Sequence, residues 1–138
     1  MAGNIKVEIV TPEKAVVSED AQIVVAPGAQ GEFGVLVGHT PFMTPLKAGS
    51  VRYTDAGGKE REVFVSGGFA EALPDKVTVL AESAERRSDI DAERAGASKD
   101  SAEKRLAEDR SSEDIDFIRA RAALERALQR LQIISSRN

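Results

Sequence analysis

The stretch VRYTDAGGKEREVFVS, residues 51–66, sets the structural class of the N-terminal half of this chain. Apolar and polar residues alternate in Val51–Thr54 and again around Val63 and Val65, which is the two-residue period of a β-strand. Asp55-Ala56-Gly57-Gly58 separates the two runs, and its glycines can supply the positive φ of a tight turn. The stretch therefore predicts a β-hairpin.

Other short apolar runs lie on both sides of this hairpin. They are rich in β-branched residues and centre on Val7 and Ile9, on Ile23–Val25, and on Val77 and Val79. Turn signals separate them at Thr11-Pro12, Ala26-Pro27-Gly28 and Pro74-Asp75. Up to about Ala81 the sequence predicts an antiparallel β-sandwich or barrel, which holds nearly all the bulky apolar residues and therefore the core.

After Ala81 the composition changes to a proline-free mixture of Ala, Glu, Arg and Leu, which favours helix. Ser88 is a candidate N-cap with an Asp three residues later, so a first helix is expected over Asp89–Glu108. A turn at Asp109–Ser112, with Ser111 or Ser112 as the next cap, would start a second helix.

Two helices joined by so short a turn form an antiparallel hairpin. The chain thus divides into residues 1–84, an all-β sandwich or barrel, and residues 85–138, a C-terminal α-helical hairpin. On the second helix an apolar stripe at steps of three and four is formed by Phe117, Ala120, Leu124, Ala127, Leu131 and Ile134.

The first helix carries a stripe with fewer large apolar side chains, formed by Ile90, Ala95, Ala102 and Leu106. The contact expected between the two stripes is the helix–helix seam. Gly96 in its interior costs about 1 kcal/mol relative to alanine. Because small side chains bury little apolar area, we expect a marginally stable hairpin that can act as a switch. The alternative is a static hairpin whose small residues let the helices approach closely.

The composition excludes several classes of protein. The 138 residues include no cysteine, which rules out disulfides, thiolate metal sites and a cysteine nucleophile. The net charge of −4 and the absence of a dense Lys/Arg tract argue against nucleic acid as a ligand. No apolar run reaches the roughly 20 residues of a membrane-spanning helix, so no direct membrane insertion is expected.

No set of residues predicts catalysis or metal binding. His39 is the single histidine, and neither a nucleophile elbow nor a His-carboxylate metal spacing accompanies it. We expect it to tie down a turn by hydrogen bonding. The glycines at 28, 31, 34 and 38 lack a following Gly-Lys-Ser/Thr, so they predict turns and bulges and not a phosphate-binding loop.

Two blocks carry a family resemblance. Gly31–Gly49, with its punctuating glycines, prolines and histidine, and Val65–Ala72 followed by Asp75–Ala81 resemble conserved elements of the epsilon subunit of rotary F-type ATP synthases. The match extends from about Val7 to Leu131. It implies a bacterial-type central-stalk subunit without an active site or a required cofactor. Such a subunit couples proton-driven rotation to ATP synthesis and inhibits ATP hydrolysis through its hairpin.

The resemblance also implies partners and a location. The sandwich would bind the gamma subunit and the membrane rotor ring of c subunits, and the C-terminal helices would contact acidic segments of the catalytic beta subunits. The complex would lie peripherally on the cytoplasmic face of the bacterial inner (plasma) membrane. Residues 117–138 contain five arginines and a single acidic residue, Glu125. This excess of positive charge favours an acidic partner. A solvated helical face is the alternative.

Ile90-Asp91-Ala92-Glu93-Arg94-Ala95 matches the Ile/Leu-Asp-x-x-Arg-Ala motif with which bacterial epsilon subunits bind ATP as a regulatory ligand of the folded hairpin. The resemblance places at the nucleotide Glu85, Ile90, Asp91, Arg94, Ala95, Arg126 and Arg130. Independently, an Asp and an Arg three residues apart share one helical face and can address a ribose or base and the phosphates.

The alternative for the motif is a capped helix start with an Asp-Arg pair worth about 0.3–0.5 kcal/mol. Ser101 also stands where the tight-binding relatives carry another arginine, and a lost charge-assisted contact forfeits about 1.5–3 kcal/mol of binding. Two rival functions stay open at this point. One is a stand-alone nucleotide hydrolase, for which a phosphate loop and a metal-binding carboxylate are missing. The other is a β-sandwich adaptor that dimerises through its C-terminal helices.

Overall fold

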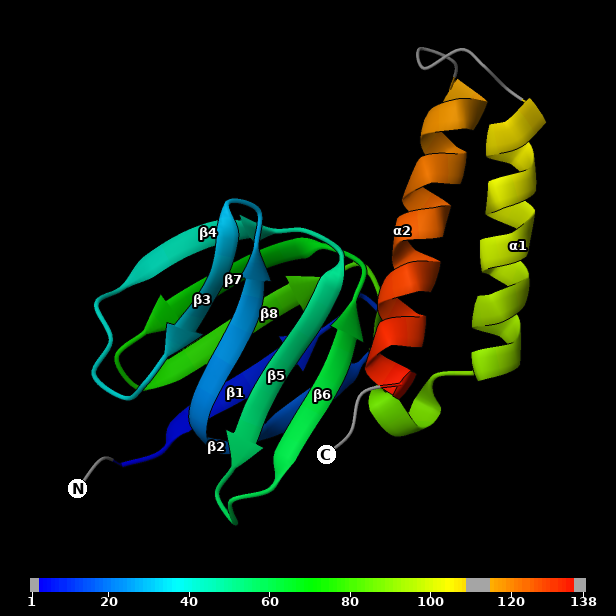
Figure 1. Cartoon of the computed structure of the whole chain (residues 1–138). Helices are drawn as coiled ribbons and strands as arrows, with labels where there is room; N and C mark the ends of the chain where they lie inside the picture. Colours follow the sequence, from blue (N-terminus) through cyan, green and yellow to red (C-terminus); the bar gives the residue numbers. More distant parts are fainter. Residues whose placement is uncertain (1–2, 109–114, 136–138) are drawn as a thin grey trace.

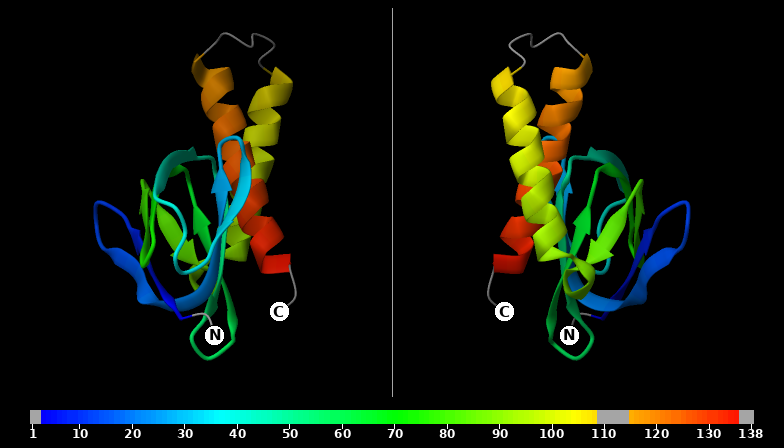
Figure 2. Two further views of the ribbon diagram at one scale, coloured as in Figure 1. Left: turned by 90° about the vertical axis from the view of Figure 1, so that its left-hand side faces the viewer. Right: turned by 90° about the vertical axis from the view of Figure 1, so that its right-hand side faces the viewer.

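A computed structural model describes residues 3–108 and 115–135 of the chain. It consists of a nine-stranded, strongly curved β-sheet followed by two antiparallel helices that stand at one side of the sheet (Figure 1). Two further views, from opposite sides and each at 90° to Figure 1, show that the helices project past the sheet at their far ends (Figure 2). The predicted fold class, a β-sandwich followed by a helical hairpin, is confirmed. Within the described residues no helix is long and apolar enough to cross a membrane.

The sheet closes because β1 pairs on both of its edges, with β2 and with β8. The strand order is β1-β8-β7-β4-β2-β5-β6-β9, and β3 pairs with β2. The pairing of β1 with β8 is parallel, an exception to the predicted antiparallel arrangement. The strands are β1 Ile5–Val10, β2 Ala15–Gly28, β3 Gly31–Val35, β4 Phe42–Leu46, β5 Gly49–Asp55, β6 Glu60–Val65, β7 Gly68–Leu73, β8 Lys76–Ala81 and β9 Ala84–Arg86.

The predicted hairpin is formed by β5 and β6, in register from Gly49 opposite Val65 to Thr54 opposite Glu60. The Asp55 carboxylate accepts the backbone N–H groups of Gly57 at 3.0 Å and Lys59 at 2.9 Å. These bonds, led by the one from Lys59, together with the Arg61 guanidinium, hold the pKa of Asp55 below its usual value. Gly58 takes the positive φ of 89°, so the turn prediction is confirmed.

One predicted strand boundary is wrong. Ala26-Pro27-Gly28 was expected to end a strand, but β2 continues to Gly28 and pairs with β3, Pro27 opposite Glu32. The turn lies at Ala29 and Gln30. A Cβ on Gly28 would stand 2.6 Å from the Gly31 carbonyl oxygen, so a glycine allows this tight return. Because Gly28 has no Cβ, β2 can run through Pro27 and pair with β3 as far as Gly28 opposite Gly31 before the chain turns.

The position of the helical hairpin follows from three consecutive buried residues of β6: Val63, Phe64 and Val65. Successive side chains of a strand point to opposite faces, so this strand must be covered on both. Val63 and Val65 belong to the sandwich core. Phe64 points the other way, where the helices lie (Figure 1).

The helices are α1, Ala92–Glu108, and α2, Ile115–Ser135, and a 3-10 turn, η1, precedes them at Arg87–Asp89. The predicted start of the first helix at Asp89, with Ser88 as its cap, is wrong. Asp91 is the cap, because its Oδ1 accepts the backbone N–H of Arg94 at 3.1 Å. The predicted turn and caps at 109–112 lie outside the described residues.

The predicted helix–helix seam is confirmed. Ala120 and Ala127 of α2 and Ala95 and Ala102 of α1 are buried. The larger members of the α2 stripe are half-buried: Phe117, Leu124, Leu131 and Ile134. Ile133, which is not part of the stripe, is also fully buried. Near it α2 approaches β5 and β6, so the C-terminal turn of α2 carries a second, shorter apolar contact.

We expect a chain of residues 1–86 to fold by itself and to unfold cooperatively in urea. Its end includes β9, which pairs with β6, and Arg86, whose Nε donates to the Val16 carbonyl at 3.2 Å. A chain of residues 1–83 lacks these bonds and should be less stable by about 2 kcal/mol, at roughly 1 kcal/mol for each net hydrogen bond. Equal stability of the two chains, measured by circular dichroism, would show that β9 adds nothing to the sandwich.

Candidate functional site

A small pocket lies where β9, the start of α1 and the end of α2 meet. It encloses about 220 Å³. Five of the seven residues predicted to contact a nucleotide line it, together with two that the sequence did not single out: Glu85, Asp91, Arg94, Ala95 and Arg130, with Asp89 and Ser98. Folding therefore brings together residues up to 45 positions apart, as in the Glu85–Arg130 pair.

The helix cap fixes the geometry at the motif itself. The Asp91 side chain holds the N–H of Arg94, and its carbonyl accepts the N–H of Ala95 at 2.9 Å. No ion pair joins the side chains of Asp91 and Arg94 in the described part of the chain. The Arg94 side chain is exposed. The capping alternative thus accounts for Asp91, and the Arg94 guanidinium is left to face the pocket.

Arg130 is the most constrained cation of the pocket. Its Nε donates to Glu85 Oε1 at 2.6 Å, with the two side chains 24% and 35% exposed. The same guanidinium lies over the Phe64 ring, 4.2 Å from the centroid. Partly desolvated cation–π contacts add roughly 0.5–2 kcal/mol to such an arrangement. Arg130 therefore has two partners on the sandwich, Glu85 of β9 and Phe64 of β6.

Two predicted residues lie elsewhere. Ile90 lines a neighbouring pocket of about 400 Å³ with Arg86, Arg87 and Ile134. Arg126 lines neither pocket, although it stands one helical turn before Arg130. Ser101 is exposed on α1, two turns after Arg94, and does not line the small pocket. The seven-residue site as a whole stays a prediction.

The charges decide what the pocket can bind. Two guanidiniums, Arg94 and Arg130, face three carboxylates: Glu85, Asp89 and Asp91. Pockets for small molecules commonly enclose about 300–1,000 Å³, so this one is tight for a nucleotide. Asp89 was missed because it was expected inside the first helix, whereas it lies in the η1 turn before α1, and no pattern in the sequence marked Ser98. In the described residues no group of three or more His, Cys, Asp or Glu side chains could hold a metal ion.

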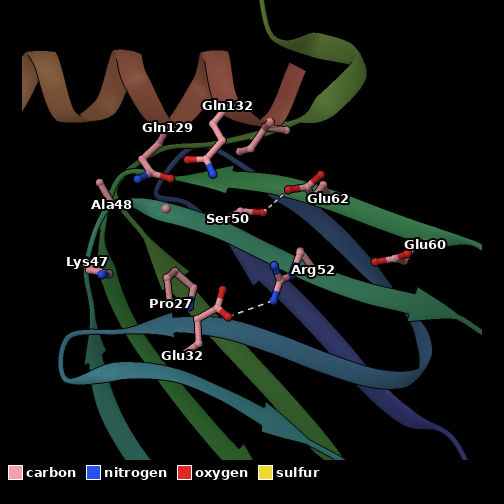
Figure 3. Close-up of a pocket in the computed structure, with 12 residues that line it drawn as sticks. Pro27, Glu32, Lys47, Ala48, Ser50, Arg52, Glu60, Glu62, Gln129 and Gln132 are labelled. Carbon is pink, nitrogen blue, oxygen red and sulfur yellow. Dashed lines mark hydrogen bonds and ion pairs between the residues drawn. The ribbon is translucent and has the colours of Figure 1, made fainter. Parts of the chain in front are cut away.

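A larger groove lies between the last two turns of α2 and the sheet. It encloses about 510 Å³, and Figure 3 shows Gln129 and Gln132 of α2 above Ser50 and Arg52 of β5. Two pairs of its polar side chains bond to each other within the sandwich: Ser50 Oγ donates to Glu62 Oε2 at 2.8 Å, and Arg52 Nη2 donates to Glu32 Oε1 at 3.1 Å. This part of the boundary between hairpin and sheet is polar and loosely filled.

An apolar patch lies on the outer face of β4, β7 and β8. Met43, Phe69 and Leu80 form it and are 68%, 54% and 57% exposed. Phe69 stands directly opposite Leu80 in the ladder, and the three side chains border one hollow of about 340 Å³. Sequence reasoning did not identify this patch. Its signal is an apolar residue at an outward position, such as Leu80 between buried Val79 and Ala81.

His39 is part of a turn, as predicted. Its Nδ1 lies 2.7 Å from the Thr40 carbonyl oxygen, and its backbone N–H donates to the Leu36 carbonyl at 3.1 Å. The ring also contacts Phe42, with 5.0 Å between centroids.

Comparison with known proteins identifies the family. Residues 4–87 match the model of the ATP synthase Delta/Epsilon chain beta-sandwich domain, and residues 88–135 match that of the Delta/Epsilon chain long alpha-helix domain. The ATP synthase epsilon chain of Desulforapulum autotrophicum is 65% identical over 137 residues, which cover 99% of this chain and 100% of the relative. That of Nitratidesulfovibrio vulgaris strain Hildenborough is 55% identical over 133 residues, covering 96% and 97%. The chain belongs to the family of ATP synthase epsilon subunits.

Solved structures of rotary synthases contain the same fold as this epsilon chain. A chain of the Euglena gracilis mitochondrial ATP synthase, from an OSCP/F1/c-ring structure, superposes with a TM-score of 0.79 at 23% identity and covers 91% of this chain and 78% of its own length. A chain of the Tetrahymena thermophila mitochondrial ATP synthase central stalk and c-ring reaches 0.58 at 10% identity, with coverages of 97% and 98%. The epsilon subunit is a non-catalytic part of the synthase.

Asp91 offers a test of the cap. Asp91→Ala should lower the stability of the hairpin by about 1 kcal/mol, because the first turn of α1 loses its side-chain acceptor. Asp91→Ser keeps an acceptor of the kind that caps helices and should retain the stability of the parent chain. Thermal unfolding followed at the helical circular dichroism signal measures both. Equal losses in the two variants would assign the effect to the charge and not to the cap.

Proposed function

We propose that this chain is the central-stalk epsilon subunit of a proton-translocating ATP synthase and couples rotation to ATP synthesis. The sandwich binds the gamma subunit and the rotor ring of c subunits, and these partners hold the chain peripherally at the cytoplasmic face of the bacterial inner membrane. The observation that carries the proposal is the apolar patch formed by Met43, Phe69 and Leu80. Contiguous exposed apolar side chains of this kind are typical of protein–protein contacts.

Burial of the patch would also contribute much of the binding free energy of a protein–protein contact. Fully burying one large apolar side chain contributes about 1.5–3 kcal/mol, so three neighbours can dominate an interface. The patch lies on β4, β7 and β8, whereas the helices pack near β5 and β6. The sandwich can therefore stay bound to its partner while the hairpin changes position.

The hairpin, in the same proposal, inhibits ATP hydrolysis by binding the catalytic beta subunits. Arg119 and Arg121 are exposed on α2 and supply positive charge for an acidic surface. A dimerising adaptor is less favoured, because α1 of the same chain already covers the α2 seam in the folded hairpin.

Regulatory ATP binding at the small pocket completes the proposal. A ligand that contacts Arg94 on α1 and Arg130 on α2 binds both helices at once, so it favours the folded hairpin over a separated one. ATP is bound in this role and is not consumed. The restricted volume and the three carboxylates of the pocket predict weak affinity.

Reassembly of the synthase tests the coupling role. The double variant Phe69→Ser/Leu80→Ser should weaken the chain's binding to the rest of the complex by at least about tenfold, since two central interface side chains are lost. Coupling between ATP hydrolysis and proton pumping should fall with it. Both side chains point outward and are more than half exposed, so the sandwich itself should stay folded.

Two chains serve as controls in this experiment. Ile118→Ser removes an apolar side chain of similar exposure, 53%, from α2 and should leave assembly unchanged. The chain of residues 1–86 keeps the patch and should preserve coupling, while hydrolysis increases because the hairpin is absent. Normal assembly of the Phe69/Leu80 double variant would remove the patch from the rotor contact.

Calorimetric titration with ATP and Mg²⁺ tests the ligand. Arg94→Ala should lower affinity by about tenfold or more through loss of a charge-assisted contact, whereas Ser101→Arg should raise it by adding one. Arg126→Ala reports whether that side chain takes part, and Arg105→Ala, an exposed change at the far end of α1, is the control. Equal affinities across the set would exclude the pocket, and steady phosphate release would contradict a non-enzymatic role.

A further inference from the structure

The folded hairpin is attached to the sandwich mainly at one end. Ile133 is buried and lines the groove beside Ser50 of β5, and Arg87 Nη2 donates to the Ile134 carbonyl at 3.1 Å. Arg130, one turn earlier, contacts Glu85 of β9 and Phe64 of β6. All of these contacts lie in the last two turns of α2, at the end nearest the sheet (Figure 1).

Apart from these contacts, the boundary between α2 and the sheet adds little further stabilisation. The groove under Gln129 and Gln132 is lined mainly by polar side chains, two pairs of which bond to each other within the sandwich (Figure 3). Polar groups that are satisfied on one side gain little free energy from the other. The attachment of the hairpin therefore depends on the few contacts at the end of α2.

Arg130 differs from the other residues at this end because it contacts two side chains of the sandwich, Glu85 and Phe64. Its Nε–H points to a carboxylate, and its flat face covers an aromatic ring. Phe64 has no exposed surface when the hairpin is folded, so loss of this cover would expose an aromatic side chain to water. A planar guanidinium meets both demands at once, which a lysine ammonium does not.

We propose that Arg130 is a latch that holds the hairpin closed on the sandwich through Glu85 and Phe64. For the regulation proposed above, and resting on that proposal, a nucleotide phosphate that recruits Arg130 must first replace the Glu85 carboxylate. The latch therefore lowers nucleotide affinity while it stabilises the same closed form.

Hairpin closure can be measured in the nucleotide-free full-length chain by energy transfer between two dyes. The chain has no cysteine, so Lys59→Cys, at the β5–β6 turn, and Ala107→Cys, near the far end of α1, give specific labelling at exposed positions. Arg130→Gln and Glu85→Gln should each raise the ratio of open to closed hairpin by about three- to tenfold, the effect of one partly exposed charge-assisted pair. Arg130→Lys should fall between Arg130→Gln and the parent.

A double-mutant cycle separates the latch from general loosening. In the Arg130→Gln background, Glu85→Gln should have no further effect, because its partner is already gone. Lys99→Gln removes an exposed ion pair with Glu103 inside α1 and should leave energy transfer unchanged. Unchanged transfer in both single variants, or full additivity in the double variant, would overturn the latch. Neither result depends on ATP binding or inhibition, so the proposed function is tested separately.

Discussion

The arrangement of this molecule depends on a strand that is buried on both of its faces. Most strands of a sandwich need cover on one side only, but β6 presents three successive buried residues, and Phe64 points away from the core. A helix must lie over it, and Arg130 is the side chain that reaches the ring. The outward Phe64 thus links the two structural units, which otherwise have separate cores.

The sandwich and the helical hairpin differ in how much apolar surface each buries internally. The sandwich core is continuous and closed by β1, which pairs on both edges. The helices bury alanines along their seam, and small side chains contribute little of the roughly 25 cal/mol per Å² that apolar burial yields. A rigid body and a weakly attached hairpin suit a subunit that keeps one contact fixed while another part moves. The same weakness makes single side chains at the attachment matter.

Local patterns predicted much of this structure, and the failures share one physical cause. Alternation around Val63 and the Asp55–Gly58 turn act within a few residues, so both were predictable. Three features depend on partners or backbone geometry that the neighbouring residues do not encode. They are the extension of β2 through Pro27, the capping role of Asp91 and the contact of Glu85 with Arg130. The outward patch was missed for a related reason: exposure is a property of the folded sheet.

The pocket shows how structural and ligand roles can compete for the same side chains. Asp91 is occupied as a cap and Arg130 as a partner of Glu85. Of the charged groups matched to the nucleotide motif, only Arg94 is both exposed and without a side-chain partner among the described residues. A phosphate entering here meets more carboxylates than guanidiniums. It gains most if Arg130 turns from Glu85 towards it, because that exchange replaces one charge-assisted bond by another of similar strength. In the proposed regulation this exchange also leaves the Glu85 carboxylate without its cation beside an anion, so the latch lowers the affinity of the closed hairpin for a nucleotide.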